Sequence, residues 1–253
     1  MVNDENIIRL KKPDMFSLER TLDCGQAFRW ESDESGIFSG VAYGKVMRVK
    51  EEGDSLLFYG MKKDDVYGVF YRYLDLGRDY REITDRYNGD KYLSEAVRAC
   101  PGIRILRQEP WEALCSFIIS QNNNIPRIKG IIKRLCESFG EELESGMYTF
   151  PSPEDLASLR AGFRAKYIID AANKVSSGEI DFDKITDSPI EFGRQELQKI
   201  KGVGKKVAEC TLLYGFGKYE AFPEDVWVKR IMAEMYPDGL PACTKGSEGI
   251  AQQ

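Results

Sequence analysis

The stretch from residue 196 to residue 228 constrains the fold most strongly, because it places a glycine turn between two helical segments. Gly202 and Gly204 flank a valine, and the residues that follow carry apolar side chains at helical spacing. This helix–hairpin–helix pattern lets backbone N–H groups and the positive end of the second helix approach a phosphate. Such a hairpin grips a DNA backbone without reading its sequence. An ordinary packing turn is the alternative, and the glycine pattern alone does not decide between the two.

Two ionisable residues near this turn are candidates for chemistry. Lys206 lies at the start of the second helix, where the helix dipole and neighbouring Lys205 disfavour a cation. A neutral amine is a nucleophile that can form a Schiff base. Asp225 precedes a further helix and is placed to cap its N-terminus, and a carboxylate there could also stabilise a developing cation on a sugar. The alternative is a solvated lysine that only contacts phosphate, and the residue pattern by itself favours that alternative.

The composition narrows the possible chemistry. The chain has 253 residues, a formal net charge of −5 and no histidine, so Lys, Asp, Glu, Tyr and Cys must carry any reaction. Its six cysteines are scattered without a C-x-x-C pair, which argues against zinc and iron–sulfur sites. We therefore expect no zinc or iron–sulfur site. The acidic total argues mildly against nucleic acid, but binding depends on local patches.

The sequence also indicates where the protein works. No run approaches the roughly 18 apolar residues of a membrane helix, and the first residues lack the order of a signal peptide. Free thiols suit a reducing compartment. We expect a cytoplasmic protein without a membrane partner, associated with the nucleoid if it binds DNA.

Local patterns divide the chain near residue 97. Before that point, short β-prone runs alternate with turn signals at Tyr43-Gly44 and at 52–54, which is typical of consecutive hairpins in an antiparallel sheet. From about residue 98, helical segments follow one another, two of them starting near Pro110 and Pro126. The sequence predicts an α+β protein, with an antiparallel β domain over 1–97 and an all-α domain over 98–253.

Two further stretches could contact nucleic acid. Arg127 lies in SQNNNIPRIKGIIKR, which has several basic residues, no acidic residue and a polar Asn run beside a helix start. A solvated helix face is the usual alternative. Phe163 stands between small and basic residues and could wedge into a base stack if it is exposed. An aromatic that anchors its loop to the core is the equal alternative.

Taken together, these stretches resemble the 8-oxoguanine DNA glycosylases of the helix–hairpin–helix superfamily. We expect the chain to be a bacterial member of that family. The matching segments run in the family's order over almost the whole chain: LDCGQAFRW, GIRILRQEPWEALCSFIISQNNNIPRI, LRAGFRAKYI, GVGKKVAEC, PEDVWV and GIAQQ. The combination is specific, whereas each piece alone is not. The resemblance implies a β domain packed on a helical domain, with the DNA lesion site between them.

The resemblance also implies roles for individual residues. Lys206 matches the catalytic lysine and Asp225 the catalytic aspartate. Gly25 matches the glycine whose carbonyl reads the extra N7 hydrogen of 8-oxoguanine, where normal guanine offers an acceptor. Gln252 matches the glutamine on the Watson–Crick edge of the base. The remaining matches to the base pocket are Phe117, Cys210 and Tyr214.

Further matches concern the DNA around the lesion. Asn122 matches the residue that fills the gap left by the flipped base, and Phe163 the wedge. Arg127 and Arg164 match arginines that contact the orphaned cytosine. The phosphate-gripping positions are Gly202 and Gly204, with Lys205 adding charge and Trp227 near the DNA.

The chain departs from the family pattern at three places. Trp227 replaces a phosphate-contacting histidine of the animal enzymes, and Glu224 replaces an apolar residue. The family also continues past Gln253 into a helix with an aromatic that stacks on the flipped base, so we expect the last helix here to be cut short.

The implied function is that of a monomeric, bifunctional enzyme that excises 8-oxoguanine from duplex DNA, preferably opposite cytosine, through a Schiff base on Lys206. The implied reaction ends in β-elimination of the strand and needs no metal or organic cofactor. Two alternatives stay open: a lesion-binding module with impaired turnover, and a monofunctional glycosylase for alkylated bases, against which Lys206 argues.

Overall fold

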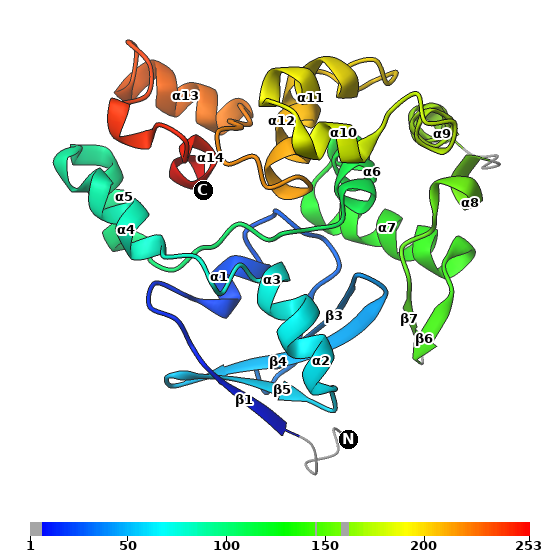
Figure 1. Cartoon of the computed structure of the whole chain (residues 1–253), viewed down its shortest axis with the longest axis horizontal. Helices are drawn as coiled ribbons and strands as arrows, with labels where there is room; N and C mark the ends of the chain where they lie inside the picture. Colours follow the sequence, from blue (N-terminus) through cyan, green and yellow to red (C-terminus); the bar gives the residue numbers. More distant parts are fainter. Residues whose placement is uncertain (1–6, 145, 158–161) are drawn as a thin grey trace.

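The computed structural model describes residues 7–144, 146–157 and 162–253, apart from the side chains of residues 162–164. Its N-terminal part is built on a five-stranded antiparallel sheet with the strand order β1-β5-β4-β3-β2 (Figure 1). The strands are β1 (Ile7–Lys11), β2 (Glu31–Ser32), β3 (Phe38–Ala42), β4 (Lys45–Glu52) and β5 (Ser55–Tyr59).

The predicted hairpins are confirmed. Ala42 pairs with Lys45, so Tyr43 and Gly44 form a two-residue turn between β3 and β4. Their φ angles are 53° and 64°, and positive φ at both positions is the mark of the turn that matches the twist of paired strands. Gly53 lies in the equally short turn between β4 and β5.

Short helices cover one face of this sheet. They are α1 (Leu18–Leu22), α2 (Lys63–Asp65), the π-helical turn η1 (Val66–Phe70) and α3 (Tyr71–Tyr73). Trp30 is fully buried between the sheet and these helices, and its indole N–H donates to the hydroxyl of Tyr73 over 2.8 Å. Residues 63–73 are thus helical throughout, with one wider turn inside the stretch.

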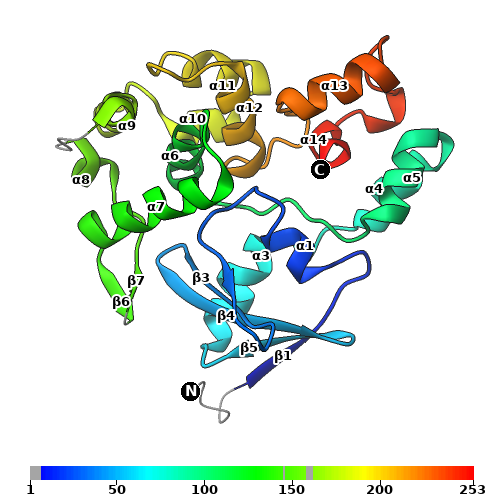
Figure 2. The same cartoon turned by 180° about the vertical axis from the view of Figure 1, so that it is seen from behind.

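The next helices leave the sheet and lie beside the C-terminal part of the chain. They are α4 (Tyr80–Asp85), η2 (Arg86–Gly89) and α5 (Lys91–Ala99), and both views place them next to α13 (Val226–Met235) and α14 (Glu248–Gln252) (Figures 1 and 2). Tyr236 donates its hydroxyl hydrogen bond to Asp90 over 2.5 Å, and Tyr87 donates to the backbone oxygen of Ser247 over 3.2 Å. The domain boundary between residues 97 and 98 stays a prediction, although these contacts tie the segment just before it to the C-terminal helices.

The remaining helices form the second layer of the molecule. Their bounds are α6 (Pro110–Ser120), α7 (Ile125–Phe139), α8 (Pro153–Ala157), α9 (Gly162–Ser176), α10 (Phe182–Asp187), α11 (Ile190–Leu197), α12 (Lys205–Tyr214) and the short η3 (Ala242–Thr244). Helix α6 is buried from Ala113 to Ile119, and Pro110 is its first residue, as predicted. The sequence interpretation missed a small hairpin in this part, β6 (Glu142–Glu144) with β7 (Met147–Tyr148).

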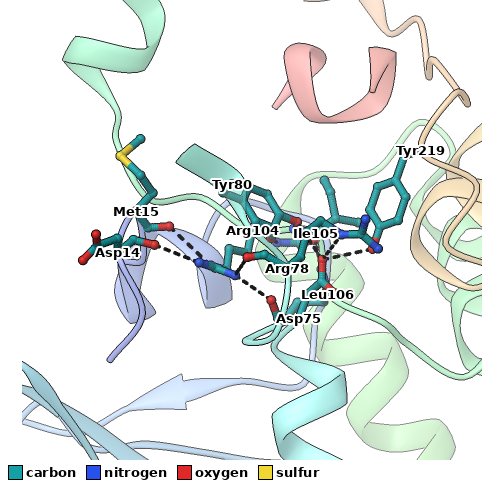
Figure 3. Close-up of polar contacts among 10 residues, drawn as sticks. Asp14, Met15, Asp75, Arg78, Tyr80, Arg104, Ile105, Leu106 and Tyr219 are labelled. Carbon is teal, nitrogen blue, oxygen red and sulfur yellow. Dashed lines mark hydrogen bonds and ion pairs between the residues drawn. The ribbon is translucent and has the colours of Figure 1, made fainter. Parts of the chain in front are cut away.

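A buried polar cluster joins the two layers (Figure 3). The Asp75 carboxylate accepts hydrogen bonds from Tyr80 and Tyr219, both over 3.1 Å, and from Arg78 over 2.7 Å. Tyr219 belongs to the helical layer, whereas Asp75 follows the last helix on the sheet. Arg104 is 1% exposed and donates to four backbone oxygens of the N-terminal half. A charge network buried in this way fixes one relative orientation of the layers.

Candidate active site

The predicted hairpin is present as α11, a turn, and α12. Gly202 has φ of +81°, and a Cβ there would lie 2.6 Å from Cγ of Tyr167. Gly204 caps α12, and a Cβ on it would meet nothing within 4 Å. The turn is held from behind by Asp170, whose carboxylate accepts from the backbone N–H of Lys201 over 2.8 Å. The N-terminus of α12 therefore faces open space across Gly204, as phosphate binding requires.

Helix α12 is buried over most of its length. The sequence predicted one apolar face, but every residue from Val207 to Tyr214 is buried, because the helix packs against both α6 and α11. Glu209 is therefore inside, where it binds Arg194 of α11 over 2.5 Å and accepts from the backbone N–H of Phe222 over 2.8 Å. This contact fixes the start of the segment that leads to Asp225. The sequence interpretation missed Glu209, although an acid within an apolar helix was its signal.

Lys206 lies at the exposed end of this helix, beside a cluster of aromatic rings. Its Nζ is 5.8 Å from the centroid of the Phe117 ring. Phe117 of α6 stacks on Tyr214 of α12, with centroids 5.2 Å apart, and Phe28 meets Phe117 edge-on at 5.9 Å. Three segments that are distant in the sequence thus converge below the amine, which is half-buried. The planar face of a base could stack against such rings.

Asp225 approaches the same place from α13. Its carboxylate accepts from the backbone N–H of Val228 over 2.8 Å, so the predicted helix-capping role is confirmed. Burial raises the pKa of the Cys210 thiol to about 12; the positive charge of Lys206 opposes this shift and the negative charge of Asp225 adds to it. Cys210 therefore lies within the electrostatic reach of both residues.

The glutamine that reaches this cluster is Gln253. Its Oε1 accepts from the hydroxyl of Tyr214 over 3.2 Å and lies 3.7 Å from Sγ of Cys24. Gln252 is the neighbour that the sequence predicted, and its Oε1 is buried without a hydrogen bond from the residues that the structure describes. The recognition role of Gln252 stays a prediction. The matching segment GIAQQ ends in both glutamines, so sequence matching did not indicate that Gln253 would be the one to contact Tyr214.

Gly25 lies in the loop after α1. Its φ is +86°, a value that glycine adopts easily, and a Cβ there would approach Cδ1 of Ile125 to 3.5 Å. The neighbouring Cys24 contacts Gln253 through its thiol. Gln253 contacts both Cys24 and Tyr214, so the loop that carries Gly25 lies near the aromatic cluster.

Several predicted DNA contacts lie on the surface around this cluster. Asn122 and Arg127 are exposed where α6 gives way to α7, and Asn124 caps α7 by accepting from the backbone N–H of Arg127. Trp227 is 68% exposed, with the guanidinium of Arg230 5.0 Å from its ring centroid. Where the animal enzymes have a phosphate-contacting histidine, this chain therefore presents the aromatic ring of Trp227 and the positive charge of Arg230.

Two predicted contacts cannot be placed beyond the backbone. Phe163 and Arg164 fall in the first turn of α9, but their side chains lie outside the described part of the chain. Their roles as wedge and cytosine contact stay predictions.

The charge of Glu224 is partly offset. Its carboxylate lies 3.1 Å from Nζ of Lys205, and both side chains reach solvent. The substitution of an apolar family position by Glu224 thus creates a surface ion pair at the mouth of the hairpin. Such exposed pairs contribute little to stability, but this one directs Lys205 toward α13.

Within the described ranges, no three or more His, Cys, Asp or Glu side chains gather in a way that could hold a metal ion. Of the helices in those ranges, none has the length and apolar character needed to cross a membrane.

A glycine hairpin, an amine beside stacked aromatics and a capping carboxylate define the class of helix–hairpin–helix base-excision proteins. The family models agree: residues 7–114 match the 8-oxoguanine DNA glycosylase N-terminal domain, and residues 115–239 match the HhH-GPD superfamily of base excision DNA repair proteins. The chain belongs to the 8-oxoguanine DNA glycosylase family.

Individual relatives support this assignment. The N-glycosylase/DNA lyase of Saccharomyces cerevisiae is 31% identical over an alignment that covers 87% of this chain and 68% of the yeast protein. A solved structure of MBOgg1 with a low-affinity DNA ligand is 42% identical, with a TM-score of 0.91, and covers all of this chain and 95% of that one. The apo form of the Clostridium acetobutylicum 8-oxoguanine glycosylase/lyase is 36% identical, with a TM-score of 0.91 over 100% and 96% of the two chains.

Proposed function

We propose that this chain is a bifunctional DNA glycosylase that excises 8-oxoguanine and then cleaves the DNA strand. The observation that carries the proposal is the position of Lys206, whose Nζ lies 5.8 Å from the centre of the Phe117 ring at the open end of α12. The amine is thereby close to aromatic rings that can receive a base and to the helix end that can receive its phosphate. The family relationship supports the same reaction, since the yeast relative is an N-glycosylase/DNA lyase.

The mechanism follows from the two ionisable groups. A duplex is bent and the damaged nucleotide is turned out of the stack, as base-excising enzymes require. Lys206 gives up a proton and its free amine attacks C1′; the bond from C1′ to the base breaks, and the base leaves with the bonding electrons and takes up a proton. Asp225 stabilises the positive charge that develops on the sugar.

Strand cleavage uses the same lysine. The covalent amine opens the sugar ring and becomes a Schiff base between Lys206 and C1′. Loss of a C2′ proton then allows the 3′ phosphate to leave in a β-elimination. Water finally hydrolyses the remaining imine and frees the lysine. Each step uses groups of this chain, DNA and water, so we expect the reaction to need no cofactor.

The preferred substrate is double-stranded DNA with 8-oxoguanine opposite cytosine. Arg127 supports this preference, because its exposed side chain follows the Asn-rich end of α6 and can donate to the carbonyl of an unpaired cytosine. A solved Clostridium acetobutylicum enzyme was complexed with duplex DNA that contains cytosine opposite 8-oxoG. We further expect the protein to act as a monomer, associated with the nucleoid in the cytoplasm.

Borohydride trapping on a duplex with 8-oxoguanine opposite cytosine tests the proposal. Reduction of the Schiff base should give a covalent protein–DNA adduct, and Lys206→Gln should abolish it. The matched control is Lys184→Gln, because Lys184 lies on α10 in a surface ion pair with Asp181 and should leave the adduct unchanged.

The alternatives give different outcomes. DNA binding without an adduct in the wild-type protein would indicate a lesion-binding module. Release of methylated purines without strand cleavage would indicate a monofunctional glycosylase. An adduct that persists in Lys206→Gln would assign the nucleophile to another residue.

A further inference from the structure

The loop that carries Gly25 is held by buried amide side chains. Gln26 is 1% exposed, and its Nε2 donates to the backbone oxygens of Thr21 over 2.8 Å and of Arg104 over 2.7 Å. Its Oε1 accepts from the backbone N–H of Leu106 over 2.9 Å. One side chain thus fastens the loop both to the preceding helix and to the segment that crosses between the two layers.

A second glutamine fixes the backbone of the same residue. Gln108 is 4% exposed, and its Nε2 donates to the backbone oxygen of Gln26 over 2.6 Å. The backbone N–H of Gln108 donates to the backbone oxygen of Tyr214 over 2.8 Å. Gln108 therefore connects the residue after Gly25 to α12, the helix that carries Lys206.

These contacts determine the direction of the Gly25 carbonyl. The carbonyl of Gly25 and the N–H of Gln26 belong to one planar peptide unit, and Gln26 is fixed on its side chain and on its own backbone oxygen. Gly25 itself supplies little restraint, because glycine has the widest conformational freedom of all residues. The orientation of this carbonyl therefore depends on Gln26 and Gln108.

We propose that Gln26 and Gln108 are positioning residues that set the discrimination of 8-oxoguanine from guanine. The inference rests on the proposed function, and in particular on base reading by the Gly25 carbonyl. A carbonyl distinguishes the N7–H donor of 8-oxoguanine from the N7 acceptor of guanine only if it points at that atom within hydrogen-bonding distance. A shift of about 1 Å in such a group can cost on the order of a hundredfold in rate.

The test compares two substrates that differ in their need for base reading. The first is a duplex with 8-oxoguanine opposite cytosine, and the second is the same duplex with a preformed abasic site, on which Lys206 cleaves the strand without reading a base. Gln108→Met keeps the length of the side chain but removes the donor to Gln26. We expect kcat/KM for base release to fall by roughly tenfold to a hundredfold, with abasic-site cleavage close to that of the wild type.

The controls separate positioning from general damage to the fold. Gln195→Met makes the same chemical change on the exposed side of α11 and should alter neither reaction. If Gln108→Met does not fold, Gln108→Asn gives the same comparison, because it keeps the amide but is too short to reach Gln26. The ratio of 8-oxoguanine to guanine release should fall in each Gln108 variant.

Different outcomes would refute the positioning role and the proposed function. Equal losses on both substrates, or an unchanged ratio of 8-oxoguanine to guanine release, would overturn the positioning role of Gln26 and Gln108. A wild-type protein that releases no 8-oxoguanine would overturn the proposed function itself.

Discussion

The two glycines of the hairpin give the sharpest test of how this structure binds DNA. They are two residues apart, yet the structure assigns them different constraints. Gly202 needs its left-handed backbone and has the Tyr167 ring against it, whereas Gly204 has ordinary φ and open space in front of it. Gly202→Ala should therefore weaken the fold, and Gly204→Ala should weaken DNA binding with little effect on the fold.

The cost of Gly202→Ala follows from two contributions. A residue with a Cβ in the left-handed region loses about 1–2 kcal/mol. The new Cβ would lie 2.6, 2.7 and 2.8 Å from three Tyr167 ring atoms, whereas carbon atoms pack best at about 3.5–4.0 Å. The ring must move by roughly 1 Å, and overpacking of this kind costs about 1–3 kcal/mol. The sum is about 2–5 kcal/mol, which lowers Tm by roughly 4–20 °C in a protein of this size.

The cost of Gly204→Ala has a different origin. Replacing a capping glycine with alanine destabilises a helix by less than about 1 kcal/mol. No steric cost adds to this at Gly204, because the new Cβ would meet no protein atom within 4 Å. The methyl group instead occupies the space through which a phosphate approaches the backbone N–H groups. Loss of one hydrogen bond to the charged phosphate should raise the Kd of Gly204→Ala for DNA by about tenfold or more.

Thermal unfolding and fluorescence-anisotropy titration with an abasic-site duplex measure both effects on the same preparations. Salt concentration must be equal in all titrations, because phosphate contacts are salt-dependent. A wild-type Tm for Gly202→Ala would contradict the expected crowding against Tyr167. A wild-type Kd for Gly204→Ala would contradict phosphate binding at the N-terminus of α12.

Three further predictions concern the buried groups. Tyr219→Phe removes one hydrogen bond to the Asp75 carboxylate and should lower the free energy of unfolding by about 1.5–3 kcal/mol; a chemical denaturation midpoint equal to that of the wild type would contradict this. Burial raises the pKa of Cys210 to about 12, so only on the order of one thiol in ten thousand is ionised at pH 8, and a disulfide reagent should label exposed Cys100 long before Cys210 in the folded protein. Burial opposes the ionisation of Asp170, but hydrogen bonds and lysine ion pairs hold its pKa below the ordinary value. Its stabilisation is present above about pH 3.9 and is lost as the pH falls through the lowered pKa; Asp170→Asn should therefore show a smaller loss of Tm on acidification than the wild type, and identical losses would refute this.

Most of the fold could be predicted from local patterns. The hairpin at Tyr43-Gly44 and the helix that starts at Pro110 depend on backbone preferences of the residues themselves, so the sequence carries the information directly. The small hairpin of β6 and β7 was missed, because its short strands have no strong alternation and are stabilised by contact with β3 and β4. Residues 80–99 likewise gave no sign that they pack beside α13 and α14.

The candidate site was predicted unevenly, for a related reason. Lys206, Asp225 and Gly25 were proposed as site residues because motifs mark them. Gln26 lies inside one of those motifs, yet its role was missed, since its partners are backbone atoms about 80 residues away. Gln108 was missed for the same reason.

The sequence by itself determined the element types, the glycine hairpin and the amine and carboxylate that follow it, because each of these depends on neighbours within a few positions. The tertiary structure decided what surrounds them. It buried α12 on all sides, stacked Phe117 on Tyr214 beneath Lys206 and brought Gln253 to the same cluster. These contacts join segments that lie far apart in the chain, and burial and hydrogen bonding between such segments leave no regular pattern in the sequence.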